Sequence, residues 1–79
     1  MVKVAVMGYG TVGAGVVEVL TMNKDLITRR IGDEIQVSYI LDLRDFPGTS
    51  IENLVTHDFN DILNDKDVNI VVETMGGLK

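Results

Sequence analysis

The sequence predicts an α/β fold: an incomplete parallel sheet of about four strands, in the order 3-2-1-4, with flanking helices. Short apolar runs rich in valine and isoleucine alternate with segments whose apolar residues recur every three or four positions. These are the patterns of buried strands and of amphipathic helices. Strands separated by helices pair in parallel through right-handed crossovers. The composition, 46% hydrophobic and 24% charged over 79 residues, is that of one small globular domain or a piece of one.

The first half of the chain predicts one strand and one long helix. Val2–Met7 is apolar except for one lysine, as in a strand buried on both faces. From Thr11 the apolar residues follow one helical stripe, so we expect a helix over about Thr11–Met22, with a kinked continuation to Arg30. Gly32 then fits a helix C-cap.

The second half predicts two further strands, a very short third one and a short helix. Ile35–Leu41 is β-rich, and the loop Asp42–Ser50 that follows contains Pro and Gly. We expect a short strand at Leu54–Val55, a two-turn helix to Asn64 with Asp58 as its N-cap, and a last strand over Val68–Thr74. Because nothing pairs the apolar edge of that last strand, we expect the chain to be the first part of a longer protein.

The composition argues against several classes of function. Seven Lys and Arg against twelve Asp and Glu give a net charge of −5, which suits neither a nucleic-acid backbone nor an anionic surface. The absence of cysteine excludes disulfides, thiolate metal sites and cysteine nucleophiles. No apolar run approaches the roughly 20 residues of a membrane helix, and no leader pattern is present. We therefore expect no membrane segment, no signal peptide and a cytoplasmic location.

We expect neither a metal site nor a catalytic residue in this chain. His57 stands beside Asp58 and is read as a solvent-facing histidine before a helix cap. The other acids of this region, Asp61, Asp65 and Asp67, lack the glycine and terminal glutamate of a calcium-binding loop. Capping and a solvated face explain these carboxylates.

The glycine-rich turn GYGTVG at residues 8–13 carries the chemistry. It follows a strand without a gap and opens a helix, the context in which G-x-G-x-x-G binds a dinucleotide. Gly8 makes the sharp turn, Gly10 lets a pyrophosphate approach the backbone, and Gly13 lets the helix lie close to the sheet. The amides of Thr11 and Val12 should contact the phosphates, and the Thr11 hydroxyl could add a hydrogen bond or cap the helix. The alternative is a tight strand–helix turn without a ligand.

The end of the second strand should select between NAD and NADP, and it offers both kinds of residue. Asp42 follows Gly13 by 29 residues (42 − 13), more than the usual gap of roughly 20. If Asp42 points toward the adenosine, its carboxylate favours NAD; if Arg44 points inward, a 2′-phosphate is accepted. A solvated loop remains the alternative for each residue.

Three segments resemble homoserine dehydrogenase. Residues 4–16, VAVMGYGTVGAGV, are similar to the opening of that family, G-[F/Y/L]-G-T-V-G-x-G-V. Residues 67–77, DVNIVVETMGG, resemble its D-[I/V]-D-[I/V]-V-V-E-x-[M/I/L]-G-G, and residues 43–45, LRD, resemble its V-R-D. The resemblance covers all 79 residues, but only the first part of an enzyme several times longer.

This resemblance implies a Rossmann-like fold and a role for each matching residue. The amides of Tyr9 to Gly13 would hold the pyrophosphate, and Arg44 would accept a 2′-phosphate. Met75 and Gly76 would line the nicotinamide side of the crevice. The cofactor would be NADP or NAD. Phe46-Pro47-Gly48 stand where many members have basic residues, which weakens a preference for NADP.

The family's reaction is the reversible NAD(P)H-dependent reduction of aspartate semialdehyde to homoserine, on the route to threonine and methionine. Its catalytic lysines and acids lie in a later domain. Residues 1–79 would therefore be the N-terminal part of the dinucleotide-binding domain, inactive alone, within an enzyme that is commonly a homo-oligomer. Two alternatives are another NAD(P)-dependent reductase and a regulatory dinucleotide sensor. The long gap before Asp42 argues against the sensor.

Overall fold

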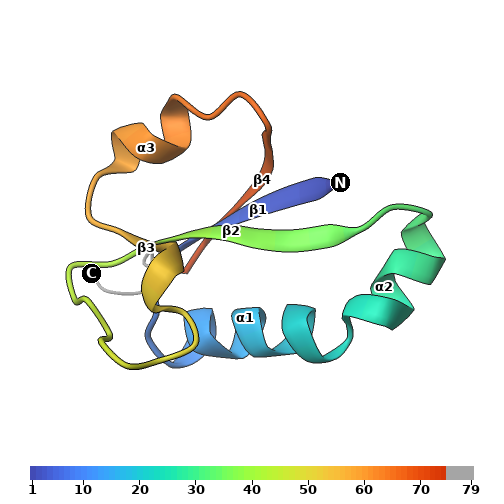
Figure 1. The fold of residues 1–79 in the computed structure, drawn as a ribbon, viewed down its shortest axis with the longest axis horizontal. Helices are drawn as coiled ribbons and strands as arrows, with labels where there is room; N and C mark the ends of the chain where they lie inside the picture. Colours follow the sequence, from blue (N-terminus) through green and yellow to red (C-terminus); the bar gives the residue numbers. More distant parts are fainter. Residues whose placement is uncertain (75–79) are drawn as a thin grey trace.

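A computed structural model of the chain describes residues 1–74. It contains one four-stranded sheet in the order β3-β2-β1-β4 (Figure 1), and all three pairings are parallel. The predicted fold class and strand order are confirmed. In chain order the elements are β1 Val2–Met7, α1 Thr11–Met22, α2 Lys24–Ile31, β2 Ile35–Leu41, the 3-10 helix η1 Glu52–Leu54, β3 Val55–Thr56, α3 Phe59–Leu63 and β4 Val68–Glu73.

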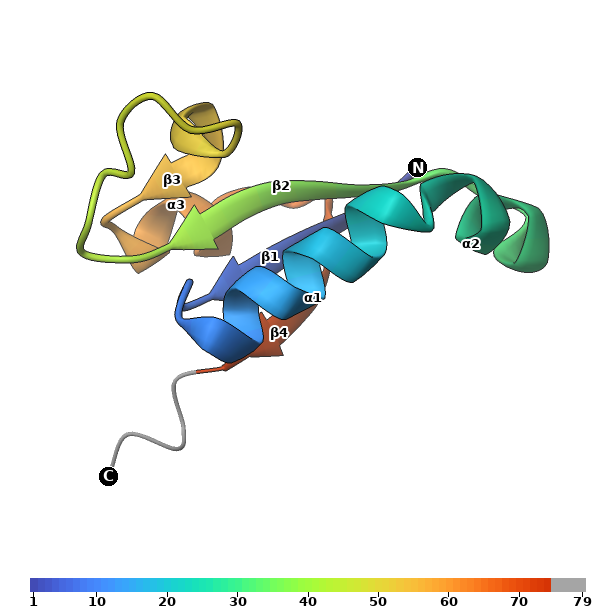
Figure 2. The same cartoon turned by 90° about the horizontal axis from the view of Figure 1, so that it is seen from below.

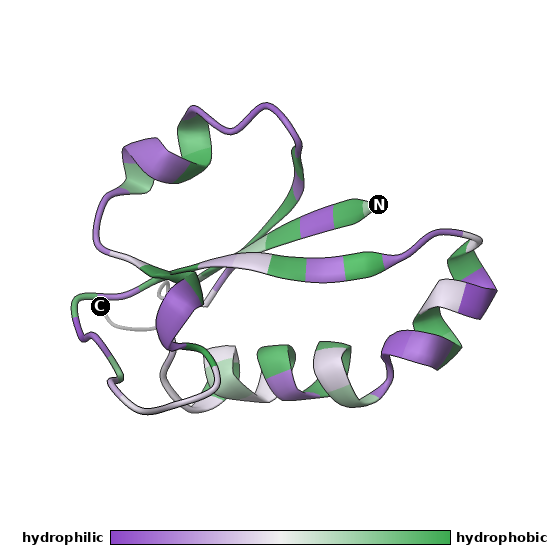
Figure 3. Ribbon diagram, in the orientation of Figure 1, coloured by the Kyte–Doolittle hydropathy of each residue, from purple (hydrophilic) through white to green (hydrophobic). Residues whose placement is uncertain are grey.

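The two faces of the sheet are covered by different helices. Figures 1 and 2 show α1 along one face and α3 on the other. Val4 and Val6 of β1 are completely buried and pack in one core cluster with Val17 of α1. Ile40 of β2 belongs to the same cluster, whereas Ala5, which alternates with the two valines, faces the opposite side. Figure 3 shows the hydrophobic residues concentrated in the strands and α1, with hydrophilic residues in the segment between α3 and β4.

The helix predicted over Thr11–Met22 is α1, which has the same bounds. The kinked continuation expected to Arg30 is instead a separate helix, α2, which begins at Lys24. Asn23 separates them: its backbone N–H and its side-chain amide both donate to the carbonyl of Val19, at 3.0 Å each. The third strand begins one residue later than expected, since Leu54 belongs to η1.

The other predicted boundaries hold within about one residue. Gly32 caps α2 with a φ of 74°, a left-handed conformation that favours glycine. Asp58 is the N-cap of α3, and its carboxylate accepts the N–H of Asn60 at 2.9 Å. No helix within residues 1–74 is long and apolar enough to cross a bilayer.

Parallel pairing brings three strand ends to the same edge of the sheet. Met7 at the end of β1 is in register with Leu41 of β2 and with Glu73 of β4. The residue after each of two strands bonds to a neighbouring strand. Gly8 N–H, after β1, donates to the Leu41 carbonyl of β2 at 2.7 Å, and Thr74 N–H, after β4, donates to the Met7 carbonyl of β1 at 3.1 Å. Ligands of open α/β sheets bind at such an edge.

Candidate functional site: the glycine turn and the end of β2

Gly8 and Gly13 are required by the backbone of the turn. Gly8 has a φ of 99°, which residues with a Cβ rarely adopt. A Cβ at Gly13 would lie 2.0 Å from the carbonyl oxygen of Gly8, so the first turn of α1 packs directly on the end of β1. The backbone would need both glycines even in a turn that binds no ligand, so they do not by themselves indicate a binding site.

Gly10 differs from them, because nothing in the fold prevents a side chain there. It has an extended backbone with a φ of −77°, and a Cβ added to it would meet no atom within 4 Å. Gly10 is the N-cap of α1, and no side chain caps the helix. The expected capping role of Thr11 is therefore wrong, since Thr11 is already the first helical residue.

The first amides of α1 have no hydrogen-bond partner within the helix. The first hydrogen bond of the helix runs from Ala14 N–H to the carbonyl of Gly10, at 2.8 Å. The N–H groups before Ala14 in α1 therefore have no partner within the helix. Together with the positive end of the helix dipole they favour an anion.

A cavity of about 650 Å³ lies over this turn, a volume typical of small-molecule sites. It brings together every predicted site residue that the structure describes. Met75 and Gly76, expected on the nicotinamide side, lie outside the described residues. The lining residues are Gly8, Tyr9, Gly10, Thr11, Val12, Gly13, Leu41, Asp42, Leu43, Arg44 and Thr74.

Thr74 is a residue of this cavity that the sequence interpretation missed. Its hydroxyl donates to the carbonyls of Met7 and Gly8, at 2.7 and 3.1 Å. It thereby fastens the end of β4 to the beginning of the glycine turn. A polar residue directly after an apolar strand was the available signal.

Asp42 and Arg44 form an ion pair at the edge of the cavity. Nε and Nη2 of Arg44 donate to the two carboxylate oxygens, at 3.0 Å each. This pairing holds the pKa of Asp42 well below its usual range, against the opposing effect of burial. The sequence left open which of the two residues points inward, and the structure places both on the cavity, bound to each other.

The ring of Phe46 packs against the guanidinium of Arg44. The guanidinium carbon of Arg44 lies 4.7 Å from the centre of its ring, within the range of a cation–π contact. The ring of Tyr9 meets it edge to face, with the centroids 5.1 Å apart. Phe46 has a φ of 52°, an uncommon conformation for a bulky residue. An aromatic residue thus stands under the cation.

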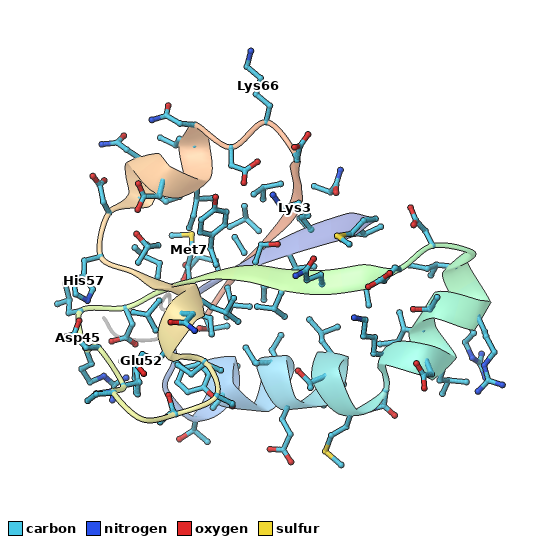
Figure 4. All side chains as sticks on the ribbon, in the orientation of Figure 1. Lys3, Met7, Asp45, Glu52, His57 and Lys66 are labelled. Carbon is cyan, nitrogen blue, oxygen red and sulfur yellow. The ribbon has the colours of Figure 1, made fainter. Side chains whose placement is uncertain are left out.

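The remaining polar residues of the sequence interpretation serve the scaffold. Nε2 of His57 lies 2.8 Å from the carboxylate of Asp45, and Figure 4 shows the two side chains together beyond the end of β2. Asp61 hydrogen-bonds the buried Thr56. No cluster of three or more potential metal ligands occurs within residues 1–74.

A second hollow, of about 540 Å³, lies by α3 on the other face of the sheet and contains a polar network. The Asp65 carboxylate accepts hydrogen bonds from Lys3 Nζ at 2.8 Å and from Tyr39 Oη at 2.7 Å. These two hydrogen bonds, of which the one from Lys3 has the larger effect, lower the pKa of Asp65 to about 2. The network joins β1, β2 and the segment after α3, which is a structural role.

Comparisons with known proteins agree with this geometry. No protein-family model matches the chain. The homoserine dehydrogenase of Neisseria gonorrhoeae is 37% identical over 78 residues, covering 96% of this chain and 18% of that protein. That of Methylobacillus glycogenes is 38% identical over 81 residues, covering 96% and 19%.

A solved homoserine dehydrogenase of S. aureus has the same fold. It superposes with a TM-score of 0.80 at 32% identity, over 91% of this chain and 19% of that one. The Rossmann-like fold expected from the resemblance is confirmed. The chain spans about a fifth of the length of the relatives it matches. In sequence and in fold, this chain is therefore similar to one segment of the homoserine dehydrogenases.

Proposed function

We propose that residues 1–79 are the N-terminal part of the NAD(P)-binding domain of a homoserine dehydrogenase. The whole protein would interconvert L-aspartate 4-semialdehyde and L-homoserine, in the cytoplasm and as a homo-oligomer. The observation that carries the proposal is Gly10. Its missing side chain leaves open the space in front of the unpaired amides of α1, at the wall of the cavity.

The residues of the turn fit a pyrophosphate. Two phosphates need closely spaced N–H donors and no side chain in the way, and the segment from Tyr9 to Gly13 supplies both. Arg44, which also lines the cavity and has a side chain 61% exposed, is suited to the adenosine end and to a 2′-phosphate. Met75 and Gly76 are assigned to the nicotinamide side by the resemblance alone.

The bound cofactor supplies the hydride chemistry. The residues of this chain would bind and orient that cofactor, and none of them is assigned a catalytic role. Substrate binding and proton transfer are assigned to the rest of the protein. We therefore expect residues 1–79 alone to bind a dinucleotide without catalysing a reaction.

Gly10→Ala tests the proposal at the residue that carries it. The added methyl group meets no protein atom, so the fold should be kept, but it fills the approach to the amides. We expect affinity for NADH and NADPH to fall by about tenfold or more, as for the loss of a hydrogen bond to a charged group. Gly15→Ala is the matched control: it is equally open but does not line the cavity, so both affinities should stay unchanged.

The reaction itself is tested on the full-length protein. Homoserine-dependent reduction of NAD(P)+ should be measurable and should fall in Gly10→Ala. Dinucleotide binding without turnover would reject the dehydrogenase and favour a regulatory sensor. Unchanged binding in Gly10→Ala would reject the assigned site.

A further inference from the structure

Asp42 stands directly after β2, where a carboxylate often binds the ribose hydroxyls of NAD. Here both of its oxygens are occupied by donors from this chain. Oδ1 accepts the backbone N–H of Arg44 at 2.9 Å and Nε of Arg44 at 3.0 Å. Oδ2 accepts the backbone N–H of Tyr9 at 2.9 Å and Nη2 of Arg44 at 3.0 Å.

These four donors saturate the carboxylate. A carboxylate offers about four lone-pair positions, and the side chain of Asp42 is only 10% exposed. A ribose hydroxyl would have to displace one of the four donors. Three of these donors belong to Arg44: its backbone N–H, Nε and Nη2. Replacing a donor from this charged residue by a neutral ribose hydroxyl would exchange a stronger hydrogen bond for a weaker one.

The donors belong to the two parts of the site that must be held in place. Tyr9 lies inside the glycine turn, which is also tied to β2 through Gly8 N–H and the Leu41 carbonyl at 2.7 Å. Arg44 is fixed between Asp42 and the Phe46 ring. Its remaining nitrogen, Nη1, has no hydrogen-bond partner within residues 1–74. That nitrogen is available to a ligand.

We propose that Asp42 is a positioning residue that anchors the glycine turn at Tyr9 and the guanidinium of Arg44, and that it does not bind the ribose. The assignment rests on the proposed function, because it concerns the same cofactor site. It reverses the usual interpretation of an acid at the end of the second strand. Discrimination between the cofactors then lies with Arg44, so Asp42 acts on both cofactors through the turn and on NADPH also through Arg44.

Two substitutions separate anchoring from ribose binding. The side-chain oxygen of the Asp42→Asn variant can still accept the Tyr9 N–H, whereas Asp42→Ala removes the acceptor. Asp45→Asn is the matched control, a neighbouring carboxylate that pairs with His57 and does not line the cavity. The readouts are hydrogen exchange of the Tyr9 amide without cofactor, and the affinities for NADH and NADPH, measured on folded protein.

We expect Asp42→Asn to retain slow exchange at Tyr9 and NADH affinity within about threefold of the wild type. Asp42→Ala should speed exchange at Tyr9 and weaken NADH binding by about three- to tenfold, as for one lost hydrogen bond in the turn. NADPH binding should weaken by at least as much, because Arg44 also loses its anchor. Asp45→Asn should change neither readout.

Two results would overturn the assignment. A loss of NADH affinity of about tenfold or more in Asp42→Asn, with tighter NADPH binding, would make Asp42 a ribose ligand. Unchanged Tyr9 exchange in Asp42→Ala would show that the turn does not depend on it. Because exchange is measured without cofactor, that result stands even if the wild type binds neither dinucleotide, which would reject the proposed function instead.

Discussion

Alanine at Gly13 and alanine at Gly15 should change the stability of the chain in opposite directions. Both positions lie in α1, where replacing glycine by alanine gains about 0.8–1 kcal/mol of helix propensity. At Gly15 the new Cβ meets nothing within 4 Å, so the gain should be realised in full. At Gly13 it would lie 2.0 Å from the oxygen and 2.9 Å from the carbon of the Gly8 carbonyl.

Those atoms belong to the backbone, so the clash at Gly13 is relieved only by moving α1 away from the end of β1. Forcing extra volume into packed structure costs about 1–3 kcal/mol. A contact of 2.0 Å with backbone atoms places Gly13 in the upper part of that range, at about 2–3 kcal/mol. After subtraction of the propensity gain, Gly13→Ala should destabilise the fold by about 1–2 kcal/mol. The two variants should then differ by about 2–3 kcal/mol in free energy of unfolding.

Urea denaturation followed by circular dichroism measures this difference. With a slope of about 1 kcal/mol per molar urea, Gly15→Ala should raise the midpoint by about 1 M and Gly13→Ala should lower it by 1–2 M. Gly13→Ala can be measured in the Gly15→Ala background, which keeps the doubly substituted chain folded. Midpoints that move in the same direction would refute the close packing of α1 on Gly8.

Three further predictions concern charge, an unpaired hydroxyl and cofactor choice. The pKa of Asp65 is lowered to about 2 by Lys3 and Tyr39, so its contribution to stability is present above about pH 4 and lost as the pH falls toward 2; acid titration of Asp65→Asn should lack this part of the transition, and a profile identical to the wild type would contradict it. The hydroxyl of Ser38 is buried and has no hydrogen-bond partner among residues 1–74, so Ser38→Ala should leave the melting temperature unchanged or raise it; a clear decrease would contradict this. Arg44→Ala should weaken NADPH binding by about 1.5–3 kcal/mol and NADH binding much less, and equal losses in parallel titrations would remove Arg44 from cofactor selection.

The sheet was predictable because its strands are self-contained patterns. Val2–Met7 and Ile35–Leu41 are apolar runs bounded by turn residues, and their observed bounds agree with the expected ones. The end of α1 at Met22 was predictable, because Met22 and Asn23 weaken the helical stripe. The separation of α2 as a second helix was not, since it depends on how Asn23 bonds to the Val19 carbonyl. The start of β3 was misplaced by one residue, because Leu54 suits the last position of η1 and the first position of a strand equally well.

The site was predictable where the backbone determines it and unpredictable where side-chain pairing does. The spacing of the glycines implies the turn whatever surrounds it. Arg44 is only two residues beyond Asp42, and their pairing depends on the local turn of the backbone after β2. Read one by one, the two residues looked like alternatives. Their pairing at 3.0 Å makes them one unit, which no pattern of single residues indicates.

The glycine pattern combines two physical demands that the structure separates. Gly8 and Gly13 are needed for the chain to turn and for α1 to pack, with or without a ligand. Gly10 satisfies no such demand, and a side chain there would project into open space. Openness alone proves little, because Gly15 is open as well and lies away from the cavity. What distinguishes Gly10 is that the open space is also the space in front of amides that have no partner within α1. The proposed binding of a pyrophosphate therefore accounts for a glycine that the fold does not require.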